Sequence, residues 1–573
     1  MSEMKLYKQW VDFDLEDMEL KEELAAINGD VESIKDRFYK DLEFGTAGLR
    51  GVIGAGTNRM NIYVIRRATQ GFADYINEKY QGEKSVAISY DSRIKSDLFA
   101  KETARVLAAN GIHVYIYPHL MPVPCLSFAV RELHCQAGVM VTASHNPAKY
   151  NGYKVYGDDG CQITSEGADK ILANIQKTDI FHGVKLVDFD AALADGTIEW
   201  IDEKVEQRFL DEVQKQSINS DVVAQAGLKV VYTPLNGAGN KPVRAILDRI
   251  GIKDVVVVPE QENPDGHFPT CPFPNPEIKE AMALGLKLCE TEKPDLLLAT
   301  DPDCDRVGIA VPDKNGDYVL VTGNEVGAML LEYICSQRIE KGIMPKDPIA
   351  VTTIVSTAIA GKIAAHYGVE MRLVLTGFKY IGEQIYDVEK QGHPERFIFG
   401  FEESYGYLAG THARDKDAVV ASMLICEMAA YLKSKNMTVL EFLDSIYQKY
   451  GVYYHVQKSF TCEGAAGMER MNEIMADLQQ NPPAEIGGLK VLSIDNYITS
   501  ETTNCETGEK TAITLPKSAV LNFVLEKGAS VCVRPSGTEP KIKTYYTTVA
   551  EQKKDAEALQ QVILESMTKI MGF

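Results

Sequence analysis

Residues 85–118 read SVAISYDSRIKSDLFAKETARVLAANGIHVYIYP, and this stretch decides the fold class. The runs SVAISYD and IHVYIYP are short and rich in β-branched and aromatic residues, whereas the amphipathic segment between them ends at Gly111. A strand, a helix and a strand in this order predict a βαβ unit with parallel strands. Because the same rhythm returns over residues 229–260 and 349–377, we expect an α/β protein with mixed, mostly parallel sheets.

The last part of the chain has a different pattern. The segments YYHVQKSFTC, GLKVLSI, AVLNFVLE and ASVCVRP are typical of strands, and EQKKDAEALQQVILESMTKIM is typical of a terminal helix. A chain of 573 residues corresponds to roughly four domains at about 150 residues each. We therefore predict three α/β domains at residues 1–205, 206–323 and 324–450, followed by a C-terminal α+β domain at residues 451–573.

Composition argues against several classes of function. The chain is 45% apolar and 25% charged, as in ordinary globular proteins, and its net charge of −21 argues against nucleic acid as a partner. We find no apolar run of about 18 residues that would span a membrane, and the opening stretch MSEMKLYKQWVDFDLEDMEL has no apolar signal core. The 11 cysteines are scattered without CxxC pairs, which favours reduced thiols and a cytoplasmic protein.

A serine-containing loop, VTASHNPAKYNG at residues 141–152, includes the end of the apolar run AGVMV. In open parallel sheets, ligands bind beyond the carboxyl ends of the strands. Pro147 restricts Asn146 to an extended or turn conformation, so the Ser144 hydroxyl is held out of the sheet. Ser144 is therefore a candidate nucleophile or phosphoryl carrier. A plain turn that uses Ser, Asn and Pro for their backbone preferences is the alternative.

Three aspartates alternate after a second apolar strand, in the sequence ATDPDCDRVG. In an extended chain Asp301, Asp303 and Asp305 point to one side, where their like charges repel unless a cation lies among them. Oxygen ligands with this charge suit Mg²⁺. An EF-hand is a poor match, because Arg306 and Pro312 stand where that motif needs glycine and glutamate. A solvated acidic turn is the alternative.

Two further loops carry groups suited to a sugar phosphate. In GFEESYGYLAGTHARDKD, Glu402 and Ser404 are placed to face sugar hydroxyls. Three alternating residues of the same loop predict a cationic or proton-transferring rim, although surface ion pairing is an alternative: His412, Arg414 and Lys416. The turn in VCVRPSGTEPKIK has the parts of a phosphate cradle, namely Arg534, Ser536, Gly537, Thr538 and Lys541.

Two arginines nearer the N-terminus are further candidate anion contacts. Arg50 belongs to the glycine-rich FGTAGLRG, whose turn would expose backbone N–H groups, and Arg93 belongs to a DSR that follows a strand. The chain has no GxxxxGK[ST] motif for a nucleoside triphosphate, and GVIGAG lacks the βα context of a dinucleotide site.

Together these loops resemble the motifs of the α-D-phosphohexomutase superfamily, which contains the phosphoglucomutases and phosphomannomutases. The likeness runs from about residue 40 to the C-terminus, and TASHNP, DPDCDR, GFEES and RPSGTEPK stand in the family's order. The chain length and FGTAGLRG are similar to the long phosphoglucomutase/phosphopentomutase branch. The resemblance implies four domains around a central cleft, each contributing one loop.

The resemblance also implies a role for each motif. Ser144 carries the phosphoryl group, and the three aspartates hold Mg²⁺ together with an oxygen of phospho-Ser144. Positions that assist proton transfer or charge stabilisation are matched by Arg50, His145, Lys154 and His412. Substrate-binding positions are matched by Arg306, Thr376, Gly377, Lys379, Glu402, Ser404, Arg414 and Lys416. The non-reacting phosphate is held by Arg534, Ser536, Gly537, Thr538 and Lys541.

On this resemblance the protein is an isomerase that moves a phosphoryl group within a sugar phosphate. It interconverts α-D-glucose 1-phosphate and glucose 6-phosphate, with glucose 1,6-bisphosphate as intermediate and activator. The EES of the sugar loop is similar to glucose-directed relatives, and mannose or pentose phosphates are alternative substrates. The partners it implies are small sugar phosphates, in a monomer or weak homo-oligomer.

Three other functions are compatible with parts of the pattern. A serine-dependent sugar-phosphate phosphatase would use the same serine and metal but needs no second phosphate cradle. An aspartate-nucleophile phosphotransferase would use Asp301 or Asp303 in a DxD pattern. A sugar-phosphate sensor would keep the loops without turnover.

Overall fold

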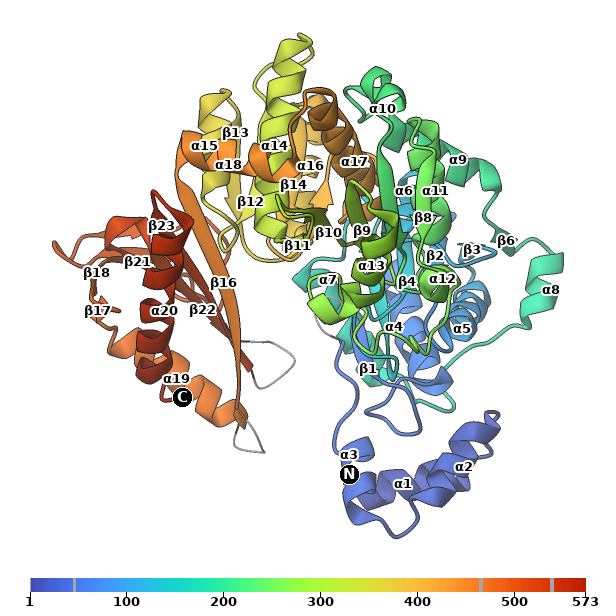
Figure 1. The fold of residues 1–573 in the computed structure, drawn as a ribbon. Coiled ribbons are helices and arrows are strands. Elements are labelled where there is room, and N and C mark those ends of the chain that lie inside the picture. Colours follow the sequence, from blue (N-terminus) through green and yellow to red (C-terminus); the bar gives the residue numbers. More distant parts are fainter. Residues whose placement is uncertain (1, 45–47, 463–466, 536–540) are drawn as a thin grey trace. The chain divides into compact units, whose positions relative to one another are not determined.

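The computed structural model describes residues 2–44, 48–462, 467–535 and 541–573 (Figure 1). Its backbone forms two compact units, one of Met1–Gly323 with Ile381–Asn436 and the other of Asn324–Tyr380 with Met437–Phe573. Residues 381–436, which the sequence analysis assigned to a third domain, thus group with the first two predicted domains. The predicted boundaries at residues 205, 323 and 450 stay predictions.

The first unit begins with three short helices, α1 (Glu3–Asp12), α2 (Met18–Ala26) and α3 (Val31–Phe38). Asp17 and Asp30 cap the second and third of them by accepting backbone N–H groups of the first turn. The helices pack around Trp10 and Phe38, each 1% exposed, whose rings meet edge to face.

The first sheet has the strand order β1-β5-β4-β2-β3-β6. Its central strands β2, β3, β4 and β6 are parallel, and β5 and β1 add an antiparallel edge. The strands are β1 (Leu49–Val52), β2 (Ser85–Tyr90), β3 (His113–Ile116), β4 (Ala137–Val141), β5 (Tyr150–Gly157) and β6 (Ile198–Trp200). The accompanying helices are α4 (Ile62–Lys79), α5 (Ser96–Ala109), α6 (Val123–Glu132), α7 (Ser165–Lys177) and α8 (Phe189–Ala194).

The second sheet, also in the first unit, has the order β11-β10-β9-β7-β8. Strands β8, β7 and β9 are parallel, and β10 and β11 turn back antiparallel. The strands are β7 (Lys229–Thr233), β8 (Asp254–Val257), β9 (Leu296–Thr300), β10 (Val307–Pro312) and β11 (Tyr318–Val321). The helices are α9 (Glu203–Gln214), α10 (Ser220–Ala226), α11 (Asn240–Arg249), α12 (Pro259–Glu262) and α13 (Lys279–Glu292).

A hairpin and a buried helix complete the first unit. Strands β14 (Phe397–Glu402) and β15 (Gly406–Leu408) pair antiparallel, and a 3₁₀ turn (Pro394–Arg396) precedes them. Helix α17 (Ala418–Ser434) is apolar over most of its surface and packs against α10 and α11. Helix α16 (Phe378–Lys390) spans the boundary between the two units in the sequence.

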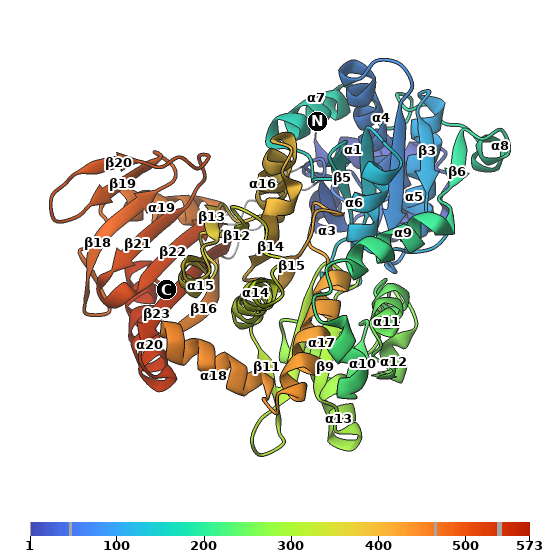
Figure 2. The same cartoon turned by 90° about the horizontal axis from the view of Figure 1, so that it is seen from above.

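The second unit contains a βαβ segment and an antiparallel sheet. Strands β12 (Ile349–Thr353) and β13 (Glu370–Val374) are parallel, as the pattern over residues 349–377 predicts. The antiparallel sheet includes β18 (Leu489–Asn496), β21 (Leu521–Leu525) and β22 (Ser530–Pro535), which lie side by side in Figure 2. Its other strands are β16 (Val452–Thr461), β17 (Glu485–Ile486), β19 (Glu501–Asn504), β20 (Lys510–Ala512) and β23 (Lys541–Ala550).

Helices α19 (Gly467–Gln480) and α20 (Lys553–Ile570) contribute to the core of this sheet through Met471, Ile563 and Met567. The remaining helices of the unit are α14 (Gly323–Glu340), α15 (Ile359–His366) and α18 (Val439–Tyr450), with a 3₁₀ turn at Glu526–Gly528. The predicted fold class, α/β domains followed by an α+β domain, is confirmed. Among the helices that the structure describes, none combines the length and apolar character that crossing a bilayer requires.

Candidate active site

Ser144 lies directly beyond the fully buried strand β4 and is itself 4% exposed. Its backbone is left-handed, with φ of 51°, a conformation that is disfavoured for a residue with a Cβ atom and is found at functional sites. Ser144 Oγ donates a hydrogen bond to Asp301 Oδ2 at 2.9 Å and lies 3.2 Å from His145 Nδ1. The structure therefore brings the predicted nucleophile to the predicted metal loop.

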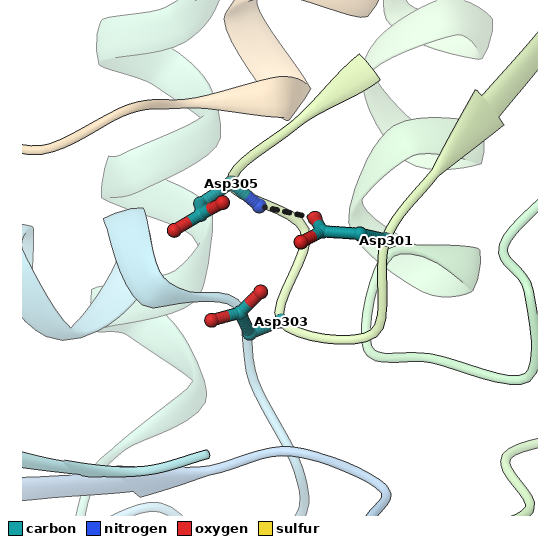
Figure 3. Close-up of side chains that lie close together, drawn as sticks. All are labelled: Asp301, Asp303 and Asp305. Atoms are coloured by element: carbon teal, nitrogen blue, oxygen red, sulfur yellow. Dashed lines mark hydrogen bonds between the residues drawn. The ribbon is translucent and has the colours of Figure 1, made fainter. Parts of the chain in front are cut away.

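The carboxylates of Asp301, Asp303 and Asp305 converge within the buried loop after β9 (Figure 3). Each offers one oxygen, and these oxygens all lie within 4.8 Å of one another. The loop is a tight turn, closed by the Cys304 N–H on the Asp301 carbonyl at 2.9 Å, and Cys304 has φ of 51°. The carboxylates thus meet because the chain turns, and the extended chain assumed in the sequence analysis is wrong.

The electrostatics of the three carboxylates fit a cation. Burial, together with Asp303 and Asp305, raises the pKa of Asp301 well above its usual range. Among the described residues, Asp303 Oδ1 and Asp305 Oδ1 are buried without a hydrogen-bond donor. Asp301 Oδ1 instead accepts the backbone N–H groups of Asp305 and Arg306, each at 3.0 Å, which fixes its orientation. Oxygen atoms that are buried, close together and short of donors are suited to a hard divalent metal.

Two buried lysines complete this cluster. Lys154 Nζ lies 2.9 Å from Asp303 Oδ2, and Lys416 Nζ lies 3.1 Å from Asp305 Oδ2 and 2.9 Å from Asp415 Oδ1. Burial lowers the pKa of both lysines, but the neighbouring carboxylates outweigh it and raise both pKa values above the ordinary value. Both side chains are therefore charged at neutral pH, so they act as hydrogen-bond donors and electrostatic partners rather than as bases.

Other predicted residues surround the same loop. Arg306 pairs with Glu277, and Arg50 Nη1 donates to Asn146 Oδ1 at 3.0 Å in the Ser144 loop. Burial lowers the pKa of His145 well below its usual value, and Arg306 and Arg50 lower it further, so the imidazole is neutral. Neutral imidazole can accept a proton through one nitrogen, which makes His145 a chemically competent acceptor beside Ser144.

The predicted sugar loop forms the turn between β14 and β15. Glu402 is the last residue of β14 and is 5% exposed, and Ser404 lies in the turn itself. Against the effect of burial, Glu277 raises the pKa of Arg306 and Asp305 raises the pKa of Lys416, and the Glu402 carboxylate adds to both increases. This places one of the two predicted sugar contacts in the electrostatic surroundings of the metal loop.

His412 and Arg414 have settings that favour structural roles. His412 Nε2 lies 2.7 Å from Asp417 Oδ2, and Asp417 caps α17 by accepting the N–H groups of Val419 and Val420. Arg414 is fully buried, and its guanidinium binds Glu389 at 2.7 Å and the Thr411 carbonyl. Their predicted catalytic and substrate-binding roles stay predictions that this geometry does not favour.

Replacing His412 by leucine is expected to lower the free energy of unfolding by about 1–2 kcal/mol, because the capping carboxylate of Asp417 loses a buried partner. We expect kcat to stay within about threefold of the parent, a difference below 1 kcal/mol. Thermal unfolding and steady-state kinetics measure both, with His393→Leu as the exposed control. A large fall in kcat with unchanged unfolding would instead support the catalytic role.

The remaining predicted site residues belong to the second unit. Gly377 has φ of 123°, which glycine tolerates, and the neighbouring Thr376 Oγ1 is buried without a hydrogen bond among the described residues. Lys379 Nζ lies 5.0 Å from the centre of the Tyr380 ring. Arg534 and Lys541 lie near the adjoining ends of β22 and β23. The other predicted cradle residues, Ser536, Gly537 and Thr538, lie outside the described residues.

Sequence reasoning missed several residues that organise the site. Glu277, the partner of Arg306, is far from it in the chain and stands in no recognisable motif. Asp91 and Thr142 hydrogen-bond each other beneath Ser144 at 2.6 Å. In the sequence, Asp91 directly follows the strand SVAISY, and ligand-binding groups lie at the carboxyl ends of parallel strands. This position was the signal that could have identified Asp91. Arg93, predicted to contact an anion, instead binds backbone carbonyl groups of the Ser144 loop.

A serine hydroxyl beside three carboxylates and two lysines, at the ends of α/β sheets, is suited to metal-assisted phosphoryl transfer. Family models of phosphoglucomutase/phosphomannomutase match the chain in four consecutive parts. They are the α/β/α domain I at residues 41–180, domain II at 207–316, domain III at 322–450 and the C-terminal domain at 465–565. The chain belongs to the phosphoglucomutase/phosphomannomutase family.

Individual relatives agree with the family models. A phosphoglucomutase of Staphylococcus aureus (strain bovine RF122 / ET3-1) is 37% identical over 512 residues, which cover 89% of this chain and 90% of that protein. The solved open form of pp63/parafusin, a phosphoglucomutase from Paramecium, has a TM-score of 0.69 at 18% identity, covering 93% of this chain and 95% of its own. An N-acetylphosphoglucosamine mutase of Aspergillus fumigatus, solved with GlcNAc-6P and magnesium, has a TM-score of 0.51 at 14% identity, covering 93% and 96%.

Proposed function

We propose that this protein is a phosphoglucomutase that interconverts α-D-glucose 1-phosphate and glucose 6-phosphate. The observation that carries the proposal is the 2.9 Å hydrogen bond from Ser144 Oγ to Asp301 Oδ2, inside a cluster of three buried carboxylates. The proposal is supported by the Staphylococcus aureus phosphoglucomutase, whose sequence is similar to this chain over 89% of the chain's length. In this proposal Ser144 carries the phosphoryl group, and glucose 1,6-bisphosphate is the intermediate.

The three aspartates, with a phosphoserine oxygen, are suited to hold Mg²⁺, which would supply Lewis-acid stabilisation of the transferring phosphoryl group. The Aspergillus mutase solved with magnesium supports this metal. Lys154 and Lys416 are charged and buried beside Asp305, so they would stabilise negative charge on the phosphoryl oxygens. Neutral His145, 3.2 Å from Ser144 Oγ, would accept or return the proton at that oxygen.

Transfer in each direction moves one phosphoryl group between two oxygen atoms. The P–O bond to Ser144 Oγ breaks as a bond forms to a sugar hydroxyl oxygen, whose proton passes to a base. The bisphosphate then presents its other phosphate to Ser144, and the reverse step leaves the isomeric monophosphate. Sugar contacts are proposed at Arg306, Thr376, Gly377, Lys379, Glu402 and Ser404, and contacts to the non-reacting phosphate at Arg534, Ser536, Gly537, Thr538 and Lys541.

Cytoplasmic location also forms part of the proposal. All eleven cysteines are free and ten of them are buried, which suits a reducing compartment. We also propose that the protein is a monomer or a weak homo-oligomer.

The substrate is tested by comparing kcat/KM on the phosphates of glucose, mannose, ribose and deoxyribose. We expect glucose 1-phosphate to exceed the others by about tenfold or more, which corresponds to about 1.4 kcal/mol. A tenfold advantage of a pentose phosphate would contradict the glucose assignment and support a phosphopentomutase. Inorganic phosphate as the main product would instead identify a phosphatase.

A further inference from the structure

Arg93 lies beneath the Ser144 loop and is 3% exposed. Its guanidinium donates to four backbone carbonyl oxygens of this loop. Nη1 binds those of Pro147 and Tyr150, each at 3.0 Å, and Nη2 binds those of Ser144 and Asn146. These oxygens occupy both NH₂ groups of the guanidinium, which would otherwise bind a phosphate, so Arg93 is built into the loop and is not placed to bind substrate.

Asp91 and Thr142 hold the other side of Ser144. Thr142 Oγ1 accepts the Ser144 backbone N–H at 2.8 Å and donates to Asp91 Oδ2 at 2.6 Å. Asp91 Oδ2 also lies 3.4 Å from Arg93 Nε, and both side chains are fully buried. The Asp91–Arg93 ion pair therefore holds both backbone polar groups of Ser144. Asp91 holds the N–H group through Thr142, and Arg93 binds the carbonyl oxygen directly.

A segment that follows the second sheet's β8 covers Arg93. The Phe268 ring lies 5.1 Å from the Arg93 guanidinium carbon, and Phe268 is 1% exposed. Gly266 packs so closely that a Cβ atom there would lie 2.4 Å from the Ile94 nitrogen. Water is thus kept from the ion pair, which strengthens its hydrogen bonds to the loop.

We propose that Asp91 and Arg93 are positioning residues that hold Ser144 in the left-handed conformation in which its Oγ faces Asp301. This inference rests on the proposed function, in which Ser144 carries the phosphoryl group. Neither side chain needs to contact the sugar, since both act on the Ser144 backbone. Loosening the pair therefore misaligns the phosphoryl carrier in both half-reactions and leaves sugar binding in place.

The test uses Arg93→Lys, Thr142→Val and a matched control, Arg105→Lys. A lysine cannot reach four carbonyl oxygens, and a valine cannot connect Asp91 to the Ser144 N–H. Arg105 likewise donates to a backbone carbonyl, that of Val187, and pairs with Glu102, but it lies outside the Ser144 loop. Single-turnover transfer from glucose 1,6-bisphosphate to Ser144, and from phospho-Ser144 to glucose 1-phosphate, separates the two half-reactions.

We expect both half-reactions to slow by about 100-fold in Arg93→Lys and Thr142→Val, with KM for glucose 1-phosphate within about twofold and Arg105→Lys unchanged. In Arg93→Ala, millimolar guanidinium is expected to restore phosphorylation at least about fivefold, whereas equal NaCl or urea is not, because the ion fills the vacated cavity.

Parent-like rates in Arg93→Lys and Thr142→Val would overturn the inference, as would a loss carried by KM alone. A fall without guanidinium rescue, matched by a loss of thermal stability, would assign Arg93 to folding and also overturn it. Parent protein that never labels Ser144 would instead overturn the proposed function, so the two failures are distinguishable.

Discussion

Replacing Ser144 by alanine is expected to lower kcat for glucose 1-phosphate by about 10⁵-fold, because it removes the oxygen that carries the phosphoryl group in the proposed function. We expect the neighbouring carboxylates not to substitute for it, since Asp301 Oδ1 already accepts two backbone N–H groups and the three aspartates are the proposed metal ligands. Incubation with glucose 1,6-bisphosphate labelled at phosphorus is expected to label the parent at Ser144 and to leave Ser144→Ala unlabelled.

Ser92→Ala is the matched control for this experiment. Ser92 Oγ is buried in the same part of the first unit and makes no hydrogen bond among the described residues, so its loss is expected to leave labelling and kcat unchanged. Retained turnover in Ser144→Ala would indicate that an aspartate accepts the phosphoryl group. Label that appears and is then released as inorganic phosphate would indicate a phosphatase.

The fold was predictable where residue periodicity is local. The strand–helix–strand pattern of residues 85–118 corresponds to β2, α5 and β3, whose parallel pairing follows from their connection by a helix. The antiparallel edge of β5 and β1 was not predictable, because its partners are distant in sequence and periodicity does not report register. The grouping of residues 381–436 with the first unit depends on packing of α17, which its continuous apolar run does not specify.

The site was predictable to the level of its motifs but not of its contacts. Convergence of the three carboxylates was expected, yet it results from a turn with Cys304 in the left-handed region, which the alternation of residues does not reveal. The alternation of His412, Arg414 and Lys416 suggested one shared rim. Of these three residues, only Lys416 pairs with an aspartate of the proposed metal site, Asp305. The backbone bends at residues 410–412 and 414–415, before Asp417 caps α17, so these side chains do not follow the expected strand-like period.

Replacing Asp303 by asparagine is expected to lower kcat by about 10³-fold, about 4 kcal/mol, because one of three metal-facing carboxylates loses its charge. Asparagine keeps the size of the side chain, so the loop should retain its turn. Affinity for Mn²⁺, measured as a spectroscopic probe of the metal site, is expected to fall by about 100-fold. Asp248→Asn is the control, because Asp248 is an exposed carboxylate paired with Lys253. It makes the same charge change and is expected to alter neither kcat nor the affinity for Mn²⁺.

Thermal unfolding separates loss of metal from loss of structure in this variant. Without metal, Asp303→Asn is expected to be less stable than the parent, since the buried Lys154 ammonium loses its carboxylate partner at 2.9 Å. With Mg²⁺ at about 100 times its dissociation constant, the parent should gain about 2.7 kcal/mol, whereas the variant should gain little. Equal stabilisation of both proteins by Mg²⁺ would show that Asp303 is not a ligand, and the proposed metal site would be wrong.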